Sequence, residues 1–290
     1  MSDRSLPPLV STAWLAGELG AADLRVVDAS WYLPSSGRDA FAEYTAGHIP
    51  GAVFFDLEKS SDQSSPLPHM LPRAEDFAQR MGMLGIGDEH RIVVYDGSGA
   101  NMSAGRAWWM FRTFGHRATA VLDGGMGKWR REARPLETGL PAVPPARFTA
   151  WLDAARVRDI AAVQSNVESL REQVVDVRAA GRFEGRDPEP RPGLRGGHIP
   201  GSRNLPFDQL VASDGTLLPP DEILRRLRAA GIDPSRPVIA TCGSGTSACV
   251  LVHALEVIGA PGAAVYDGSW SEWGGAAGVP VATGPADPRD

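Results

Sequence analysis

A short glycine-rich segment contains the residue of this chain that is best suited to covalent chemistry. Cys242 begins the sequence Cys-Gly-Ser-Gly-Thr-Ser, which lies between an apolar run and a helical pattern. A turn that joins a buried strand to a helix surrounds itself with backbone N–H groups and favours an anion. A thiol in such a turn is stabilised as the thiolate, which is its nucleophilic form. The segment therefore predicts a nucleophilic cysteine, and the alternative is a small buried hydrophobic residue.

The same segment has features of two other chemistries. Residues 243–248 fit the dinucleotide-binding pattern G-x-G-x-x-A, and Asp267 ends a later apolar run, where a ribose-binding acid would lie. That pattern belongs to the first strand of its fold, whereas this strand comes late in the chain. A cysteine phosphatase would need an arginine where Ala248 stands, because a guanidinium clamps the phosphate. Neither alternative is favoured, and a titration with NAD tests the first.

The chain contains one pattern twice. Motifs of the first half recur in the same order in the second: Gly-His-Ile-Pro-Gly at 47–51 and 197–201, Val-Val-Asp at 26–28 and 174–176, and tryptophan at 129 and 273. Collinear repeats of this kind indicate a tandem duplication. In the first copy, Asp96 precedes a Gly-Ser-Gly tripeptide. In the second copy, Cys242 precedes the same tripeptide. Aspartate has no thiol chemistry, so only the second copy should carry the nucleophile.

Each copy alternates short apolar runs with helical patterns, which predicts an α/β fold with a parallel sheet and helices on both faces. The buried-type strands Arg91–Tyr95 and Pro237–Thr241 precede helices expected at about 103–114 and 245–258. Four prolines between Ala133 and Pro145 are typical of a linker. We expect an N-terminal domain without the catalytic cysteine at 1–132, a linker at 133–150 and a C-terminal catalytic domain at 151–290.

Composition and charge argue against several classes of protein. Hydrophobic residues make up 43% of the 290 residues, and a net charge of −6 argues against nucleic-acid and anionic-membrane partners. Cys242 and Cys249 fit neither a disulfide framework nor a zinc pattern. No apolar run approaches the roughly 20 residues of a membrane span, and residues 1–4 do not begin a signal peptide. We expect a cytoplasmic protein without a metal or cofactor.

Taken together, these motifs give the chain a resemblance to the two-domain rhodanese sulfurtransferases. The resemblance extends from about Leu24 to Trp273. The cysteine segment is similar to the Cys-Gly-Ser-Gly-Val-Thr loop of the 3-mercaptopyruvate subfamily, and it lacks the Arg-Lys pair that follows the cysteine in thiosulfate sulfurtransferases. Four further motifs resemble the 3-mercaptopyruvate subfamily, at residues 28–34, 69–72, 181–183 and 267–270.

This resemblance implies a sulfur-transfer reaction at Cys242. The cysteine would take the sulfur of 3-mercaptopyruvate as a persulfide, release pyruvate, and pass the sulfur to a thiol acceptor such as thioredoxin or to cyanide. The backbone amides of the loop would bind the anionic sulfur. The loop residues implied in this role are Gly243, Gly245, Thr246 and Ser247. Threonine and serine replace the Val-Thr of the subfamily at the last two of these positions, which changes the polarity of the cradle.

The resemblance also implies groups that bind substrate and move protons. Arg182 and Arg191 match two arginines that hold the substrate's carboxylate and carbonyl, a task that suits planar cationic forks. Ser244 and His69 match two members of a Ser-His-acid relay, and the acid falls on Glu58, where the family has aspartate. Without the resemblance, the arginines would be interpreted as solvated side chains of a polar segment and His69 as a loop histidine.

Two functional alternatives stay open. The first is a thiosulfate:cyanide sulfurtransferase, which a comparison of turnover on the two donors distinguishes. The second is a persulfide carrier or binding module without catalysis, which would turn over no sulfur donor. Because His69 and Glu58 belong to the first copy and Cys242 to the second, we also expect the site to lie between the two domains.

Overall fold

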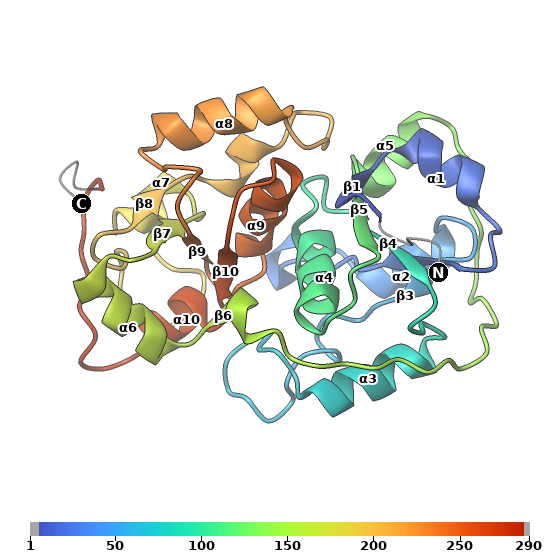
Figure 1. Ribbon diagram of the computed structural model, residues 1–290, viewed down its shortest axis with the longest axis horizontal. Helices are drawn as coiled ribbons and strands as arrows, with labels where there is room; N and C mark the ends of the chain where they lie inside the picture. Colours follow the sequence, from blue (N-terminus) through green and yellow to red (C-terminus); the bar gives the residue numbers. More distant parts are fainter. Residues whose placement is uncertain (1–5, 287–290) are drawn as a thin grey trace. The chain divides into compact units, whose positions relative to one another are not determined.

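The computed structural model describes residues 6–286, and these form two compact units (Figure 1). Unit 1 contains the described residues up to Gln63, together with Leu71–Asp153 and Val211–Leu217. Unit 2 contains Ser64–Met70, Ala154–Leu210 and the described residues from Leu218 onward. Each unit therefore includes a short segment from the other half of the chain. The expectation of no signal peptide depends on residues 1–4, which lie outside the described residues.

Each unit is built on a five-stranded sheet, and the two sheets have equivalent strand orders. The order in unit 1 is β1-β5-β4-β2-β3, with β1 at Leu9–Val10, β2 at Leu24–Asp28, β3 at Val53–Phe54, β4 at Arg91–Tyr95 and β5 at Thr119–Leu122. The order in unit 2 is β6-β10-β9-β7-β8, with β6 at Val157–Arg158, β7 at Gln173–Asp176, β8 at Arg203–Asn204, β9 at Val238–Thr241 and β10 at Ala263–Tyr266. All paired strands of both sheets are parallel, which confirms the duplicated α/β fold.

Helices connect the strands in both units. Unit 1 contains α1 at Thr12–Glu18, a 3₁₀ turn η1 at Pro34–Ser36, α2 at Ala40–Ala46, α3 at Ala74–Met83, α4 at Met102–Thr113 and α5 at Gly125–Arg131. Unit 2 contains η2 at Ala154–Arg156, α6 at Ile160–Ser169, α7 at Ala180–Phe183, η3 at Phe207–Leu210, α8 at Pro220–Ala229, α9 at Ala248–Val257 and α10 at Ser269–Trp273. The helix predicted from about 245 begins three residues later, which leaves the residues after Cys242 in a loop.

Alternating side chains of the central strands cover both faces of each sheet. In unit 1, Val93 of β4 packs in a cluster with Leu15 of α1 and Trp129 of α5. Its neighbours Ile92 and Val94 are also buried, on the face where α4 packs against β4 and β5. Unit 2 repeats the arrangement, with α6 and α10 on one face and α9 on the other. Helices therefore flank both faces of each sheet, as predicted.

A tryptophan and a histidine that recur in both copies bind the segment that follows the last helix of each unit. The indole N–H of Trp129 donates to the carbonyl of Pro135, and that of Trp273 donates to the carbonyl of Pro280, both at 2.8 Å. His48 and His198 form antiparallel bridges with residues 137 and 282. These residues repeat because each sheet needs the same closing contacts.

The segments that each unit takes from the other half of the chain make specific contacts. In unit 1, the backbone N–H of Leu217 donates to Asp123 Oδ1 at 2.9 Å, and the Asn101 side-chain amide donates to the carbonyl of Gly215 at 3.4 Å. In unit 2, the exchanged segment Ser64–Met70 carries His69. The exchange therefore places polar groups of one sequence copy against the other copy's loops.

The proline-rich segment 133–150 packs closely against unit 1. The backbone N–H of Ala146 donates to the carbonyl of Gly82 at 2.9 Å, and Thr149 donates through its N–H and hydroxyl groups to the Asp88 carboxylate. A Cβ at Gly82 would lie 2.6 Å from the carbonyl oxygen of Ala146, so only glycine permits this approach. The segment is therefore a packed strap along its length.

One ionisable side chain lies inside the aromatic core of unit 1. The His116 ring stacks on Phe148, with centroids 5.6 Å apart, and meets Phe111 edge-on. Its Nδ1 lies 2.8 Å from Thr119 Oγ1. Burial disfavours the charged ring and lowers the pKa of His116 to about 4.

We expect His116 to make the protein acid-sensitive. The unfolded chain binds this proton below about pH 6.5 and the folded chain only near pH 4, so stability is lost as the pH falls through that window. Between pH 7 and pH 5 the loss should be about 2 kcal/mol. His116→Gln should remove it in urea unfolding at both pH values, because the other groups titrate alike in both proteins. Equal losses in the two proteins would contradict the assignment.

Candidate active site

The cysteine predicted as nucleophile lies at the end of β9 and is held by the start of α10. Cys242 is 1% exposed, and its backbone N–H donates to Ser269 Oγ at 3.2 Å. The carbonyl of Cys242 accepts from the Trp270 N–H at 3.0 Å. The carbonyl of Gly243 accepts from both the N–H and the hydroxyl of Ser271. Because residues of α10 donate to two of its carbonyls, the loop backbone is fixed.

The loop ends at the N-terminus of α9. Gly245 has φ +74°, a left-handed conformation that glycine adopts without strain. Cys249, the second residue of α9, donates its thiol to the carbonyl of Gly245 at 3.2 Å and is buried. Cys242 and Cys249 form no disulfide. The helix N-terminus favours negative charge at the loop, and Cys249 serves there as packing.

The equivalent turn of unit 1 already contains an anion of its own. One carboxylate oxygen of Asp96 accepts from the N–H of Ser98 at 2.8 Å and from the Ser98 hydroxyl at 2.6 Å. The other accepts from the N–H of Ala104 at 2.9 Å and from the Ser103 hydroxyl at 3.1 Å. The carboxylate therefore occupies the anion position at the start of α4.

Two arginines of unit 2 lie beside the cysteine loop. A Cβ built on Gly243 would lie 3.3 Å from Nη2 of Arg182 and 3.8 Å from Nη1 of Arg191. Arg182 belongs to α7 and Arg191 to the loop that follows it. The structure therefore brings both predicted arginines to the residue next to Cys242, where their charges favour an anionic molecule.

A buried carboxylate that the sequence interpretation missed orients one of these two arginines, Arg182. The Glu189 side chain is 2% exposed, and it accepts from Nη2 of Arg182 at 2.6 Å and from Nη1 of Arg178 at 2.7 Å. Arg178 also pairs with Asp176 at 2.6 Å and lies 4.3 Å from the centre of the Trp270 ring. The only sequence signal was an acid between the two predicted arginines, flanked by prolines at 188 and 190.

His69 lies in unit 2 against the cysteine loop. Its Nδ1 is 3.1 Å from Ser244 Oγ and 3.1 Å from Thr246 Oγ1. The side chain is 2% exposed, and its backbone has φ +61°, which is uncommon outside glycine. The structure therefore places two predicted members of the relay within hydrogen-bond distance. Ser247, the last predicted loop residue, is the N-cap of α9.

The third predicted member of the relay belongs to unit 1. Glu58 accepts a hydrogen bond at Oε1 from the indole N–H of Trp31, at 2.8 Å. Its participation in the relay stays a prediction. The contacts of His69, Arg182 and the cysteine loop described above all lie inside unit 2.

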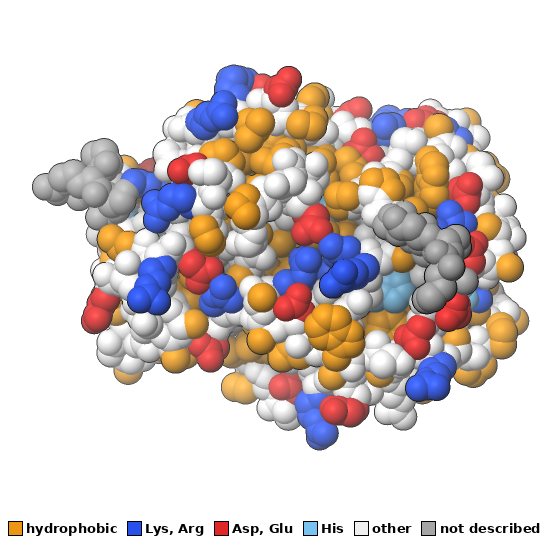
Figure 2. Space-filling model, in the orientation of Figure 1, with side chains coloured by type: hydrophobic (Ala, Val, Ile, Leu, Met, Phe, Trp, Pro, Cys, Tyr) orange, Lys and Arg blue, Asp and Glu red, His pale blue; other side chains and the backbone are white. Residues whose placement is uncertain are grey.

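Residues 6–286 lack the features that would indicate a metal site or a membrane span. No group of three or more His, Cys, Asp or Glu side chains there could hold a metal ion, and no helix there is long and apolar enough to cross a membrane. The glycine-rich loop follows β9, the fourth strand of unit 2 in sequence, where a dinucleotide loop would follow the first. Figure 2 shows acidic and basic side chains interspersed with apolar ones on the visible face.

A duplicated parallel α/β fold, with one cysteine in a glycine-rich turn beside two arginines, is the arrangement that a cysteine nucleophile acting on a small anion would need. A family model described as the rhodanese-like domain matches residues 11–132 and 159–276. The chain therefore belongs to the rhodanese family, and the predicted membership is confirmed.

The relatives include proteins named for 3-mercaptopyruvate and proteins named for thiosulfate. Human 3-mercaptopyruvate sulfurtransferase is 47% identical over 270 residues, which cover 91% of each chain. Bovine thiosulfate sulfurtransferase is 45% identical over 273 residues, again with 91% of each chain covered. The crystal structure of SseA from Escherichia coli, described as a 3-mercaptopyruvate sulfotransferase, is 39% identical with a TM-score of 0.84, covering 92% of this chain and 100% of that one.

Asp96→Ala should destabilise unit 1 strongly, because it removes a buried carboxylate that accepts four hydrogen bonds. We expect a loss of about 2–4 kcal/mol in the free energy of unfolding, measured with urea. Asp76→Ala, at an exposed position in the first turn of α3, is the matched control and should cost less than about 1 kcal/mol. Similar losses in the two variants would show that the carboxylate does not occupy an anion site.

Proposed function

We propose that this chain is a sulfurtransferase that takes sulfur from 3-mercaptopyruvate onto Cys242 and passes it to a thiol acceptor. The observation that carries the proposal is the placement of Arg182 and Arg191 beside Gly243, next to the cysteine. A 2-keto acid offers a carboxylate and a carbonyl oxygen, which two planar guanidinium groups bind with defined geometry. Such a substrate would bring its sulfur to the end of β9.

The proposed reaction has two steps at sulfur. The Cys242 thiolate attacks the substrate's sulfur, an S–S bond forms, and the C–S bond breaks with its electron pair on carbon. The resulting enolate takes a proton and leaves as pyruvate. In the second step, the acceptor thiolate attacks the outer sulfur and regenerates the Cys242 thiolate. The amides of residues 243–248 at the start of α9 favour the negative charge on sulfur in both steps.

Proton movement is assigned to His69 and Ser244. The His69 ring lies 3.1 Å from the Ser244 hydroxyl, within the range for direct proton transfer. In our proposal this pair takes the proton of the substrate thiol and returns it to the carbon that leaves. Glu58 is proposed as the acid that completes the relay, as the family resemblance implies.

Thiosulfate is the competing donor. The bovine thiosulfate sulfurtransferase and the human 3-mercaptopyruvate enzyme are almost equally similar to this chain, so overall identity does not separate the two. The loop residues after Ser244 do separate the two donors. They are glycine, threonine and serine, which carry no charge, whereas a basic pair there would favour a dianion. The neutral loop therefore favours the keto acid as donor.

We propose a reducing compartment, the cytoplasm, and a small thiol protein such as thioredoxin as the acceptor. Cys242 and Cys249 form no disulfide, and the mechanism needs Cys242 as a thiolate between turnovers. The second step transfers a neutral sulfur atom, so the acceptor must be a nucleophile, such as a thiol or cyanide.

Incubation with 3-mercaptopyruvate should add one sulfur atom to the intact protein, detected by mass spectrometry. Cys242→Ser should gain none, whereas the matched control Cys249→Ser should gain one, because the buried Cys249 thiol donates to the carbonyl of Gly245 and takes no part in the proposed reaction. We also expect kcat/KM for 3-mercaptopyruvate to exceed that for thiosulfate by at least about tenfold. Equal labelling of Cys242→Ser would contradict the nucleophile, a preference for thiosulfate would contradict the donor, and no turnover of either would favour a carrier.

Glu189 should act as a positioning residue for Arg182. In Glu189→Gln the charge that orients the guanidinium is lost, so KM for 3-mercaptopyruvate should rise about tenfold while kcat changes little. Glu184→Gln is the matched control, because Glu184 pairs with the largely exposed Arg186. Glu189→Asp should restore part of the affinity. An unchanged KM, or a loss confined to kcat, would contradict this role.

A further inference from the structure

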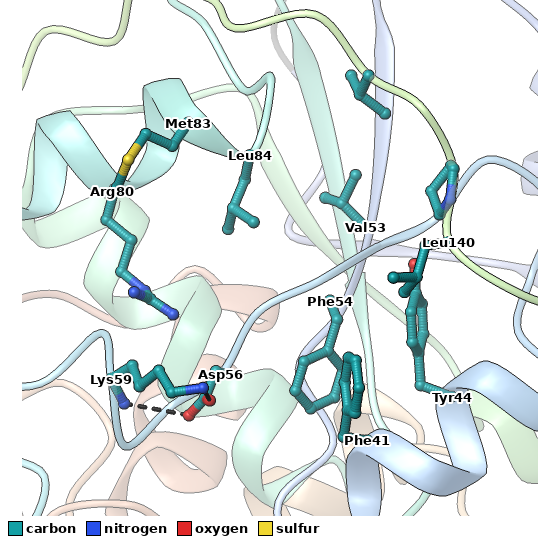
Figure 3. Close-up of a pocket in the computed structure, with 12 residues that line it drawn as sticks. Phe41, Tyr44, Val53, Phe54, Asp56, Lys59, Arg80, Met83, Leu84 and Leu140 are labelled. Carbon is teal, nitrogen blue, oxygen red and sulfur yellow. Dashed lines mark hydrogen bonds and ion pairs between the residues drawn. The ribbon is translucent and has the colours of Figure 1, made fainter.

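Unit 1 contains a pocket of about 470 Å³ that takes no part in the site described above (Figure 3). It lies between α2, β3, α3 and the strap at 140–143. Its body is apolar and includes Phe41, Phe54, Leu84 and Leu140. The volume lies in the range of pockets that bind small organic molecules.

One end of the pocket is cationic. Lys59 Nζ pairs with Asp56 Oδ2 at 2.9 Å, so these two charges neutralise each other. Arg80 donates from Nε to the hydroxyl of Ser60 at 2.8 Å, and over residues 6–286 no carboxylate forms an ion pair with it. Figure 3 shows Arg80 extending from α3 toward Lys59 and Asp56. This end of the pocket therefore carries one positive charge that is not balanced by a carboxylate.

The wall formed by the strap is preformed. Before the pocket, the N–H of Gly139 donates to the carbonyl of Thr45 at 3.0 Å. After it, the N–H of Ala146 donates to the carbonyl of Gly82 at 2.9 Å, and Val143 packs against Gly85. Because the strap is fixed on both sides of the pocket, a ligand would find the cavity already shaped and would lose little free energy in ordering it.

The apolar part of the pocket leaves large hydrophobic side chains in contact with water. Phe41 is 49% exposed, Met83 is 60% exposed and Leu140 is 67% exposed. All three line this one pocket, although exposed large hydrophobic residues are few among the described residues. A concentration of exposed apolar surface around a cavity is typical of a binding site.

We propose that this pocket binds a small amphipathic monocarboxylate, with its apolar chain or ring between Phe41 and Leu140 and its carboxylate at Arg80. A cation would meet Arg80 and Lys59, and a purely apolar ligand would leave the guanidinium without a partner. A doubly charged anion such as a phosphate ester is disfavoured because Asp56 lies at the same end. One carboxylate with an apolar body satisfies both parts of the pocket.

Isothermal titration of the full chain with decanoate tests this proposal. We expect saturable binding at one site, and about tenfold weaker binding to Arg80→Met, which keeps the apolar stem and removes the charge. The matched control is Arg73→Met: Arg73 precedes α3, is largely exposed and lies outside the pocket. Arg73→Met should bind decanoate as tightly as the unmodified protein does. Decylammonium has the same chain with the opposite charge and should bind at least about tenfold more weakly than decanoate.

A second variant keeps the test independent of any structural role of Arg80. Leu140 is exposed, so Leu140→Glu should leave the fold and the sulfurtransferase activity intact while weakening decanoate binding by at least about tenfold. The proposal is overturned if Arg80→Met and Arg73→Met bind decanoate equally, if decylammonium binds as tightly, if Leu140→Glu has no effect, or if the unmodified protein shows no saturable binding.

Discussion

A helix that begins where a parallel strand ends leaves backbone N–H groups that need a negative partner, and both units of this protein contain that arrangement. Unit 1 meets the requirement internally, because the Asp96 carboxylate accepts from the N–H of Ser98 in the turn and from the N–H of Ala104 in the first turn of α4. Unit 2 has Cys242 at the equivalent position and surrounds it with glycine and small polar residues. The backbone constraint is the same in both units, so one side chain distinguishes the turn that a carboxylate fills from the turn that we propose to be reactive.

Charged side chains near the cysteine loop form a series of ion pairs with alternating sign. Asp176 pairs with Arg178, Arg178 pairs with Glu189, and Glu189 pairs with Arg182 at the edge of the loop. Only the last guanidinium of this series is substantially exposed. A series of buried pairs orients its members but leaves little net charge inside the protein. The four charges of this series cancel, so Arg182 offers oriented donors to a substrate, and the net positive charge beside the loop comes from Arg191.

Local patterns predicted the parts of the fold that depend on neighbouring residues. The strand before Cys242 and the helix after it were predicted to within a few residues, because an apolar run, glycines and helical periodicity are all local signals. The strands β1 and β6 have two residues each and form only by pairing with β5 and β10, so no periodicity marks them. The contact of His69 with Ser244 spans 175 positions and was reached only through the family resemblance. Glu189 was missed because its partners Arg178 and Arg182 lie 11 and 7 positions away, and no local pattern marks such pairs.

The exchange of short segments between the two units has a consequence for the history of the chain. After a duplication, two tandem copies are at first interchangeable, and either could diverge or be lost without harm to the other. Once Ser64–Met70 had joined unit 2 and Val211–Leu217 had joined unit 1, each copy depended on sequence encoded in its neighbour. A chain with only the cysteine half would therefore lack Ser64–Met70, and with it the contact of His69 with Ser244.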